Sequence, residues 1–182
     1  MLIMVSVLAC SDAAAGESIS EPALRQELLD LARADQAVRA SRPVDLRALR
    51  KVDTENTERL KSVVERYGWP GASTVGADGA QAAWLLVQHA SGDPGFQRMA
   101  LSMIEPLVER GEISVKLYAY LYDRTHSPQR YGTQGACTAP GVWSPREIED
   151  PVNVDERRAL AKIEPVKLAD YVALASEKSC GK

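Results

Sequence analysis

Apolar residues recur at helical spacing through most of this chain, and this periodicity fixes its fold class. Leu24, Leu28 and Leu31 form one apolar stripe, and Leu60 and Val63 belong to a second. Steps of three and four place such residues on one face of an α-helix. From these stripes and the Gly and Pro signals between them, we predict helices near residues 20–40, 44–67, 78–90, 94–110, 114–124, 154–161 and 165–176.

The composition supports one helical body. The chain has 182 residues, and only 5% of them are aromatic, so Leu, Val and Ala must fill the core. Beyond residue 124 the chain becomes rich in Gly, Pro, Ser and Thr, and we expect a short hairpin there, 130–134 against 142–148. The sequence predicts a mainly α-helical single domain at 20–176, with five to seven helices, a small irregular or β-hairpin element after residue 124 and a tail at 177–182.

Charge and motifs exclude several classes of function. The net charge is −3, so no basic surface invites nucleic acid. Two His residues, without HxxxH, HExxH or CxxC spacing, predict no metal site. GxSxG, P-loop and GxGxxG motifs are lacking, and we expect no cofactor.

The N-terminal stretch MLIMVSVLAC indicates export. Val7-Leu8-Ala9-Cys10 resembles a lipoprotein box, in which Cys10 is lipidated, and Ser11 fits sorting to the outer membrane facing the periplasm. Residues 1–19 would then be signal and tether, and the lipid would make the membrane a partner. Cleavage after Ala15 would instead release a soluble periplasmic or secreted protein, and an ordinary cytoplasmic N-terminus is the third interpretation.

Two cysteines remain after Cys10. In an oxidising compartment, Cys137 and Cys180 can form a disulfide. Closing that loop would stabilise the fold by up to about 4 kcal/mol. Two unpaired thiols are the alternative, because nothing in the sequence sets their distance.

Polar residues interrupt the predicted apolar stripes. Asp35 occupies a stripe position of the first helix, Asp53 and Asn56 those of the second, and Gln97 one of the fourth. A buried unpaired carboxylate costs several kcal/mol, so we expect partners such as Arg39 or Arg124. Several inward polar groups predict a wet cleft that holds a small polar ligand or a peptide segment. The alternative is that they are internal architecture.

His89 is the one group in the predicted helical core that titrates near neutrality, since His126 lies in a loop. Paired with Asp53, it would act as a general acid or base. A hydrogen-bonded histidine at a helix end is the alternative. The loop that contains Tyr131, Thr133 and Gln134 offers hydroxyls and an amide, and it would either close over a pocket or satisfy its own backbone.

The chain also resembles a known bacterial family. The motifs that carry the resemblance are ADQAVR (34–39), DTEN (53–56), YGWPGASTVG (67–76), QHASGDPGFQ (88–97), YAYLYDR (118–124), QRYGTQ (129–134) and IEDPVNVDERRAL (148–160). They resemble, over residues 25–172, the domain of unknown function 6624. Pro106 and Cys180 depart from the family pattern.

The resemblance carries no activity, but it implies that the polar positions matter as a set. Its members are Asp35, Gln36, Arg39, Asp53, Asn56, His89, Gln97, Asp123, Arg124, Gln129, Tyr131, Thr133 and Gln134. We expect first an exported protein that binds a small polar ligand or peptide. A hydrolase-type enzyme that uses Asp53 and His89, without an obvious nucleophile, is the second hypothesis. A structural envelope lipoprotein is the third.

Overall fold

The computed structural model describes residues 19–181 and contains, over that range, seven helices and one two-stranded antiparallel sheet. This confirms the predicted mainly helical fold with a hairpin after residue 124. The predicted lipid site, Cys10, lies outside the described residues. No helix of the described part combines the length and apolar character that crossing a membrane requires.

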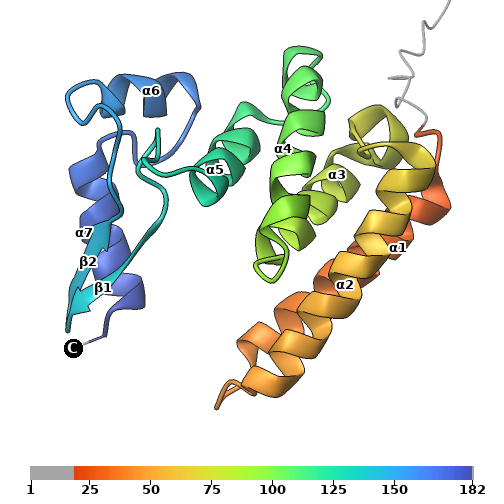
Figure 1. The fold of residues 1–182 in the computed structure, drawn as a ribbon, viewed down its shortest axis with the longest axis horizontal. Coiled ribbons are helices and arrows are strands. Elements are labelled where there is room, and N and C mark those ends of the chain that lie inside the picture. Colours follow the sequence, from red (N-terminus) through yellow and green to blue (C-terminus); the bar gives the residue numbers. More distant parts are fainter. Residues whose placement is uncertain (1–18, 182) are drawn as a thin grey trace, which may run out of the picture.

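Four long helices form the larger part of the molecule (Figure 1). They are α1 (Pro22–Ala40), α2 (Leu46–Tyr67), α3 (Ala72–His89) and α4 (Pro94–Glu109). α1 and α2 form an antiparallel pair, and α1 packs chiefly against α3. Buried side chains from all four helices, such as Leu28, Leu60, Leu86 and Ile104, make one continuous core. The predicted stripes therefore face one another in the helical interior.

Local signals explain where these helices begin and end. Asp45 caps α2 by accepting hydrogen bonds from the backbone N–H groups of Arg47 and Ala48. Asp93 caps α4 in the same way, with its Oδ1 at 2.9 Å from the backbone nitrogen of Phe96. The third helix was predicted to begin near residue 78, but helical backbone already begins at Ala72. Gly76, at φ 74° and ψ 161°, breaks α3 into two pieces, which only glycine does without steric cost.

The remaining elements pack at one end of this body (Figure 1). α5 (Val115–Thr125) leads to the hairpin of β1 (Gly135–Ala139) and β2 (Val142–Pro145), followed by α6 (Val154–Leu160) and α7 (Leu168–Ser179). α7 lies against β2, and the disulfide Cys137–Cys180, with Cα atoms 5.5 Å apart, joins its end to β1. The disulfide hypothesis is confirmed.

The first strand of the hairpin lies further along the chain than predicted. Its first strand begins at Gly135, not at residue 130, and Gly135 pairs with Pro145. A β-carbon at Gly135 would lie 2.2 Å from the carbonyl oxygen of Ser144 and 2.4 Å from the ring of Trp143. The glycine is therefore required by this close approach, and residues 129–134 are left to form a separate loop.

Candidate functional site

Asp35 is the centre of a buried charged network. Its side chain, on the inner face of α1 near the C-terminal end of that helix, has 0% exposed surface. Its two carboxylate oxygens lie 2.9 and 3.0 Å from Nδ1 of His89, at the end of α3. The side-chain amide of Gln36 donates a further hydrogen bond of 2.8 Å. The predicted partner of His89 was Asp53, but the carboxylate that contacts its ring is Asp35.

Arg39 connects Asp35 with Asp53. One turn after Asp35 on α1, its Nη1 lies 2.9 Å from Oδ1 of Asp35 in an ion-pair contact without hydrogen-bond geometry. Its Nη2 donates to Oδ1 of Asp53 on α2 at 2.7 Å. Asp53 thus reaches the histidine network through a shared guanidinium. The network ties α1, α2 and α3 together by charge.

The surroundings of Asp35 keep it ionised. Burial alone would raise the pKa of its carboxyl, but hydrogen bonds from His89 and Gln36 and the positive charges of His89 and Arg39 outweigh that effect. The pKa of Asp35 is therefore below its usual value. A fully buried carboxylate with this many partners is stable in its charged form and fixes the orientation of the imidazole.

His89 has one ring nitrogen left for other work. Because the Asp35 carboxylate only accepts hydrogen bonds, Nδ1 of His89 carries a proton. No described residue forms a hydrogen bond with Nε2, and 25% of the side chain is exposed. In the neutral ring, Nε2 is then a free acceptor, held in place by a buried carboxylate. This is the arrangement of a general base with its orienting acid.

The buried side-chain amides near the end of α3 differ in whether they form hydrogen bonds. Gln97, from α4, donates 2.9 and 3.3 Å hydrogen bonds to the carbonyl oxygens of Val87 and Gln88 and so caps the end of α3. Asn56 is 5% exposed, yet its side-chain nitrogen has no partner among the described residues. The side-chain oxygen of Gln88, a residue that is 9% exposed, lacks one as well. An unmade buried hydrogen bond costs about 1–3 kcal/mol.

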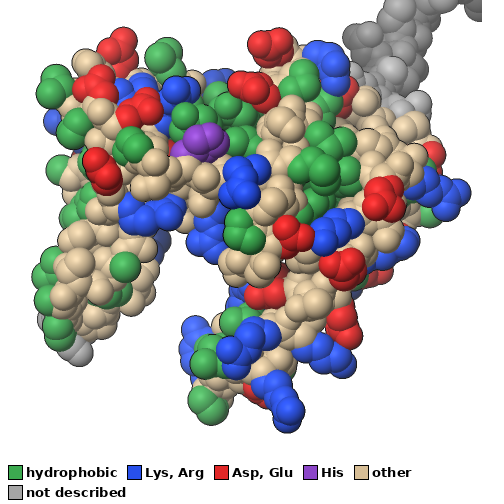
Figure 2. Space-filling model, viewed as in Figure 1, with side chains coloured by type: hydrophobic (Ala, Val, Ile, Leu, Met, Phe, Trp, Pro, Cys, Tyr) green, Lys and Arg blue, Asp and Glu red, His purple; other side chains and the backbone are tan. Residues whose placement is uncertain are grey.

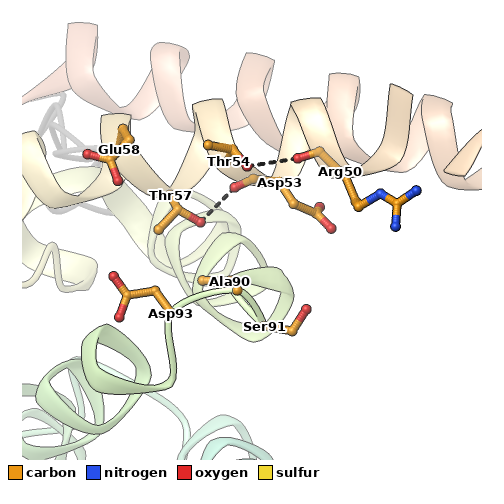
Figure 3. A pocket seen from close by; sticks show the side chains of 9 residues that line it. Arg50, Asp53, Thr54, Thr57, Glu58, Ala90, Ser91 and Asp93 are labelled. Carbon is orange, nitrogen blue, oxygen red and sulfur yellow. Dashed lines mark hydrogen bonds between the residues drawn. The ribbon is translucent and has the colours of Figure 1, made fainter. Parts of the chain in front are cut away.

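A cleft of about 440 Å³ opens between α2 and the α3–α4 turn (Figure 3). We call it the α2–turn cleft. In Figure 3, Asp53 and Thr57 on α2 face Ser91 and Asp93 across it. Asp53 belongs to both the cleft and the buried network, so the two are continuous. The lining residues are Arg50, Asp53, Thr54, Thr57, Glu58, Ala90, Ser91, Gly92 and Asp93.

Lys61 lies beside this cleft and balances part of its negative charge. Its ammonium group is 2.7 Å from Asp93 and 3.1 Å from Glu58. Hydrogen bonds from Lys61 and from the backbone of Phe96 hold the pKa of Asp93 below its usual value. The Asp93 carboxylate is therefore charged at neutral pH.

A second polar cluster lies around residues 129–134. The buried Asp123, on α5, accepts hydrogen bonds from the backbone nitrogens of Arg130, Tyr131 and Thr133, and from the hydroxyl of Thr133, at 2.7–3.2 Å. Such a carboxylate substitutes for the cross-strand hydrogen bonds that a hairpin would supply. It explains why this segment is a loop and not a strand.

Gln129 completes this loop. Its side-chain amide donates to the carbonyl oxygens of Gln134 and Arg146 and accepts from the backbone nitrogen of Gln134. Arg124 reaches the side-chain oxygen of Gln134 at 3.4 Å, on the molecular surface. The polar groups of the loop are thus largely used by the loop itself.

The predicted polar set is therefore divided. Asp35, Gln36, Arg39, Asp53 and His89 meet between α1, α2 and α3, whereas the second cluster joins α5, the loop and β2. Among residues 19–181, no hydrogen bond or ion pair links the two groups. Sequence reasoning missed the polar lining residues Thr54, Thr57, Glu58, Ser91 and Asp93, because polar residues between the apolar positions of a helix, or in a turn, give no sign of a cleft. In the same described range no three His, Cys, Asp or Glu side chains are grouped as metal ligands.

Comparison with known proteins now places the chain. Residues 22–181 match the model of a family described as a family of unknown function, DUF6624. The chain belongs to the DUF6624 family. No curated protein and no solved structure matches it. In this DUF6624 protein, the resemblance seen in the sequence motifs is confirmed over nearly the whole described range.

Proposed function

We propose that this DUF6624 protein binds a small polar ligand, or a polar segment of a peptide, in the α2–turn cleft. The main evidence is that hydroxyls and carboxylates on α2 and on the α3–α4 turn face one another across a cleft of about 440 Å³. This volume lies in the range of small-molecule sites, in which a few placed polar groups fix the ligand's orientation. We infer a polar ligand because Asp53, Thr57 and Asp93 place oxygen atoms on both sides of the cleft.

The residues behind the cleft support this proposal. Arg39 and Asp35 hold the Asp53 carboxylate from the inside, so the cleft wall is preorganised before a ligand arrives.

A plug in the cleft tests the proposal. Thermal-shift screening with amino acids, sugars, small amines and short peptides, followed by isothermal titration of the hits, should identify a ligand. Ser91→Trp fills the cleft and should abolish that binding. Ser102→Trp places the same side chain on an exposed face of α4 and should leave it intact. If both variants bound the ligand equally well, the α2–turn cleft would not be its binding site.

A second candidate function is hydrolysis, favoured by one observation, the His89–Asp35 pair. Nε2 of His89 would accept a proton from water as the water oxygen attacks a carbonyl carbon. The same nitrogen would then return the proton to the leaving group, while Asp35 stabilises the charged ring. The sequence has no obvious nucleophile, so water is the attacking group.

Chromogenic esters and amides test this second candidate. A turnover that belongs to the protein should be lost in His89→Gln, which keeps a side chain of similar length without an imidazole. Circular dichroism confirms that the variant is folded. Turnover that survives in His89→Gln would show that the histidine is architectural.

We also propose that the protein is exported and held by a lipid on Cys10, on the outer membrane facing the periplasm. The lipoprotein-like VLAC motif supports a lipid anchor, and the disulfide between Cys137 and Cys180 supports an oxidising compartment. Fractionation of cells that produce Cys10→Ala tests the anchor. The variant should move from the membrane to the soluble fraction, and an unchanged distribution would rule the lipid out.

A further inference from the structure

The connection between α1 and α2 combines positive charge with exposed aliphatic side chains. We call residues 41–51 the α1–α2 tip. Its residues Val44 and Leu46 are 40% and 61% exposed. Figure 2 shows Lys and Arg side chains beside hydrophobic ones at this end of the helix pair. The exposed basic residues of the tip are Arg42, Arg47, Arg50 and Lys51.

Little of this charge is neutralised within the protein. Four basic residues and one acidic residue, Asp45, give the tip a formal net charge of +3, although the whole chain carries −3. The Asp45 carboxylate is engaged in capping α2. Within residues 19–181 the one ion pair of the tip joins Lys51 and Glu55 at 3.7 Å, and both side chains are largely exposed. Such surface pairs hold charge weakly.

Folding explains only part of these features. Arg42 donates to the carbonyl oxygens of Arg39 and Ser41 at the end of α1. Val44 and Leu46 contribute little to the core, however, and Arg47 and Arg50 lie in the first turns of α2, where the helix dipole favours acids. Aliphatic side chains surrounded by Lys and Arg are instead typical of segments that lie in a lipid headgroup layer.

We propose that the α1–α2 tip docks on a membrane surface that contains anionic lipid. Val44 and Leu46 enter the headgroup region, and the guanidinium and ammonium groups contact lipid phosphates. An acidic protein partner would use the arginines but would not require two aliphatic side chains between them. The inference does not depend on the α2–turn cleft, with which the tip shares only Arg50.

Vesicle sedimentation of the full chain tests this surface. Phosphatidylcholine vesicles are compared with vesicles that also contain phosphatidylglycerol. The apolar N-terminal stretch adds to binding on both kinds of vesicle. The contribution of the tip is therefore measured by the gain, which is the increase in binding on the anionic vesicles. Each basic residue near such a surface contributes roughly fivefold to partitioning. Arg47→Glu with Lys51→Glu should therefore lower the gain by at least about 25-fold.

The controls separate lipid docking from general charge effects. Arg98→Glu with Lys116→Glu makes the same charge change on α4 and α5, where both residues are exposed, and should keep the gain. Val44→Ser with Leu46→Ser should also lower binding. Three results would overturn the proposal: equal binding of the natural chain to both vesicles, an equal loss in the control, or full binding by the serine variant. The last would show that charge alone attracts the tip to the vesicles, without entry of Val44 and Leu46 into the headgroup region.

Discussion

The carboxylate of Asp35, with no exposed surface, lies 2.9 Å from Nδ1 of His89 and so fixes the ring at the end of a different helix. This contact joins the C-terminal part of α1 to the last residue of α3. Arg39 extends it to Asp53, at the wall of the α2–turn cleft. A charged network inside the helical body is thus connected to a space that a ligand can enter.

Asp35→Asn tests how much this network stabilises the fold. The variant removes the negative charge that compensates Arg39 and that accepts hydrogen bonds from His89 and Gln36, and we expect the free energy of unfolding at pH 7 to fall by about 3 kcal/mol. Urea denaturation measures it. Asp30→Asn, which removes an exposed carboxylate paired with Arg33 on the same helix, should change stability by less than about 1 kcal/mol. Equal effects of the two substitutions would contradict a special role for Asp35.

The stabilisation by Asp35 should also depend on pH. Its pKa in the folded protein lies below the value of about 3.9 that an unfolded Asp has. The contribution is therefore fully present above about pH 4, and it is lost as pH falls through the folded pKa. The stability difference between the natural chain and Asp35→Asn should shrink in denaturation curves recorded from pH 7 to pH 3. A difference that stays constant over this range would show that the charge of Asp35 is not what stabilises the fold.

Asp123→Asn should loosen the loop at 129–134. An amide keeps one acceptor oxygen and places a donor where the backbone N–H groups of Tyr131 and Thr133 point. We expect a loss of about 2–3 kcal/mol and faster hydrogen exchange in the loop. Asp170→Asn, at an exposed position of α7, is the control and should have little effect on either. Unchanged exchange in the loop would mean that the carboxylate does not organise it.

Removal of the disulfide should act mainly on the C-terminal helix. Cys137→Ser with Cys180→Ser opens a loop of 43 residues, for a loss of up to about 4 kcal/mol. No residue of α7 is fully buried, so this helix should show the earliest loss of hydrogen-exchange protection. If α7 kept its protection in the double variant, its packing on β2 alone would be sufficient.

The helices and the unusual polar positions could be predicted because both depend on local periodicity. Asp35 stood out since it occupies a position of an apolar stripe, and it proved to be fully buried. Its partner could not be predicted, because pairing depends on how the helices pack. Since α1 packs chiefly on α3, His89 meets Asp35, while Asp53 is reached only through Arg39.

The loop at 129–134 shows a second limit. Tyr131, Thr133 and Gln134 offer hydrogen-bonding groups, and sequence alone does not say whether those groups face a guest or their own backbone. Asp123, ten residues before Thr133, decides the matter by accepting hydrogen bonds from the loop. The α2–turn cleft could not be predicted from the sequence for a different reason. Ser91 and Asp93 lie in the turn between α3 and α4, where polar residues are common, so the sequence does not mark them as part of a cleft wall.

NMR gives the sharpest test of the proposal that a polar ligand binds in the α2–turn cleft. Amide and imidazole shifts of the ¹⁵N-labelled protein are recorded while mixtures of amino acids, sugars and small amines are added. The account predicts shift changes at 50–58 and 90–93 and at the ring of His89, with residues 129–134 unaffected. Changes centred on 129–134, or none at the cleft with a mixture that raises thermal stability, would contradict it.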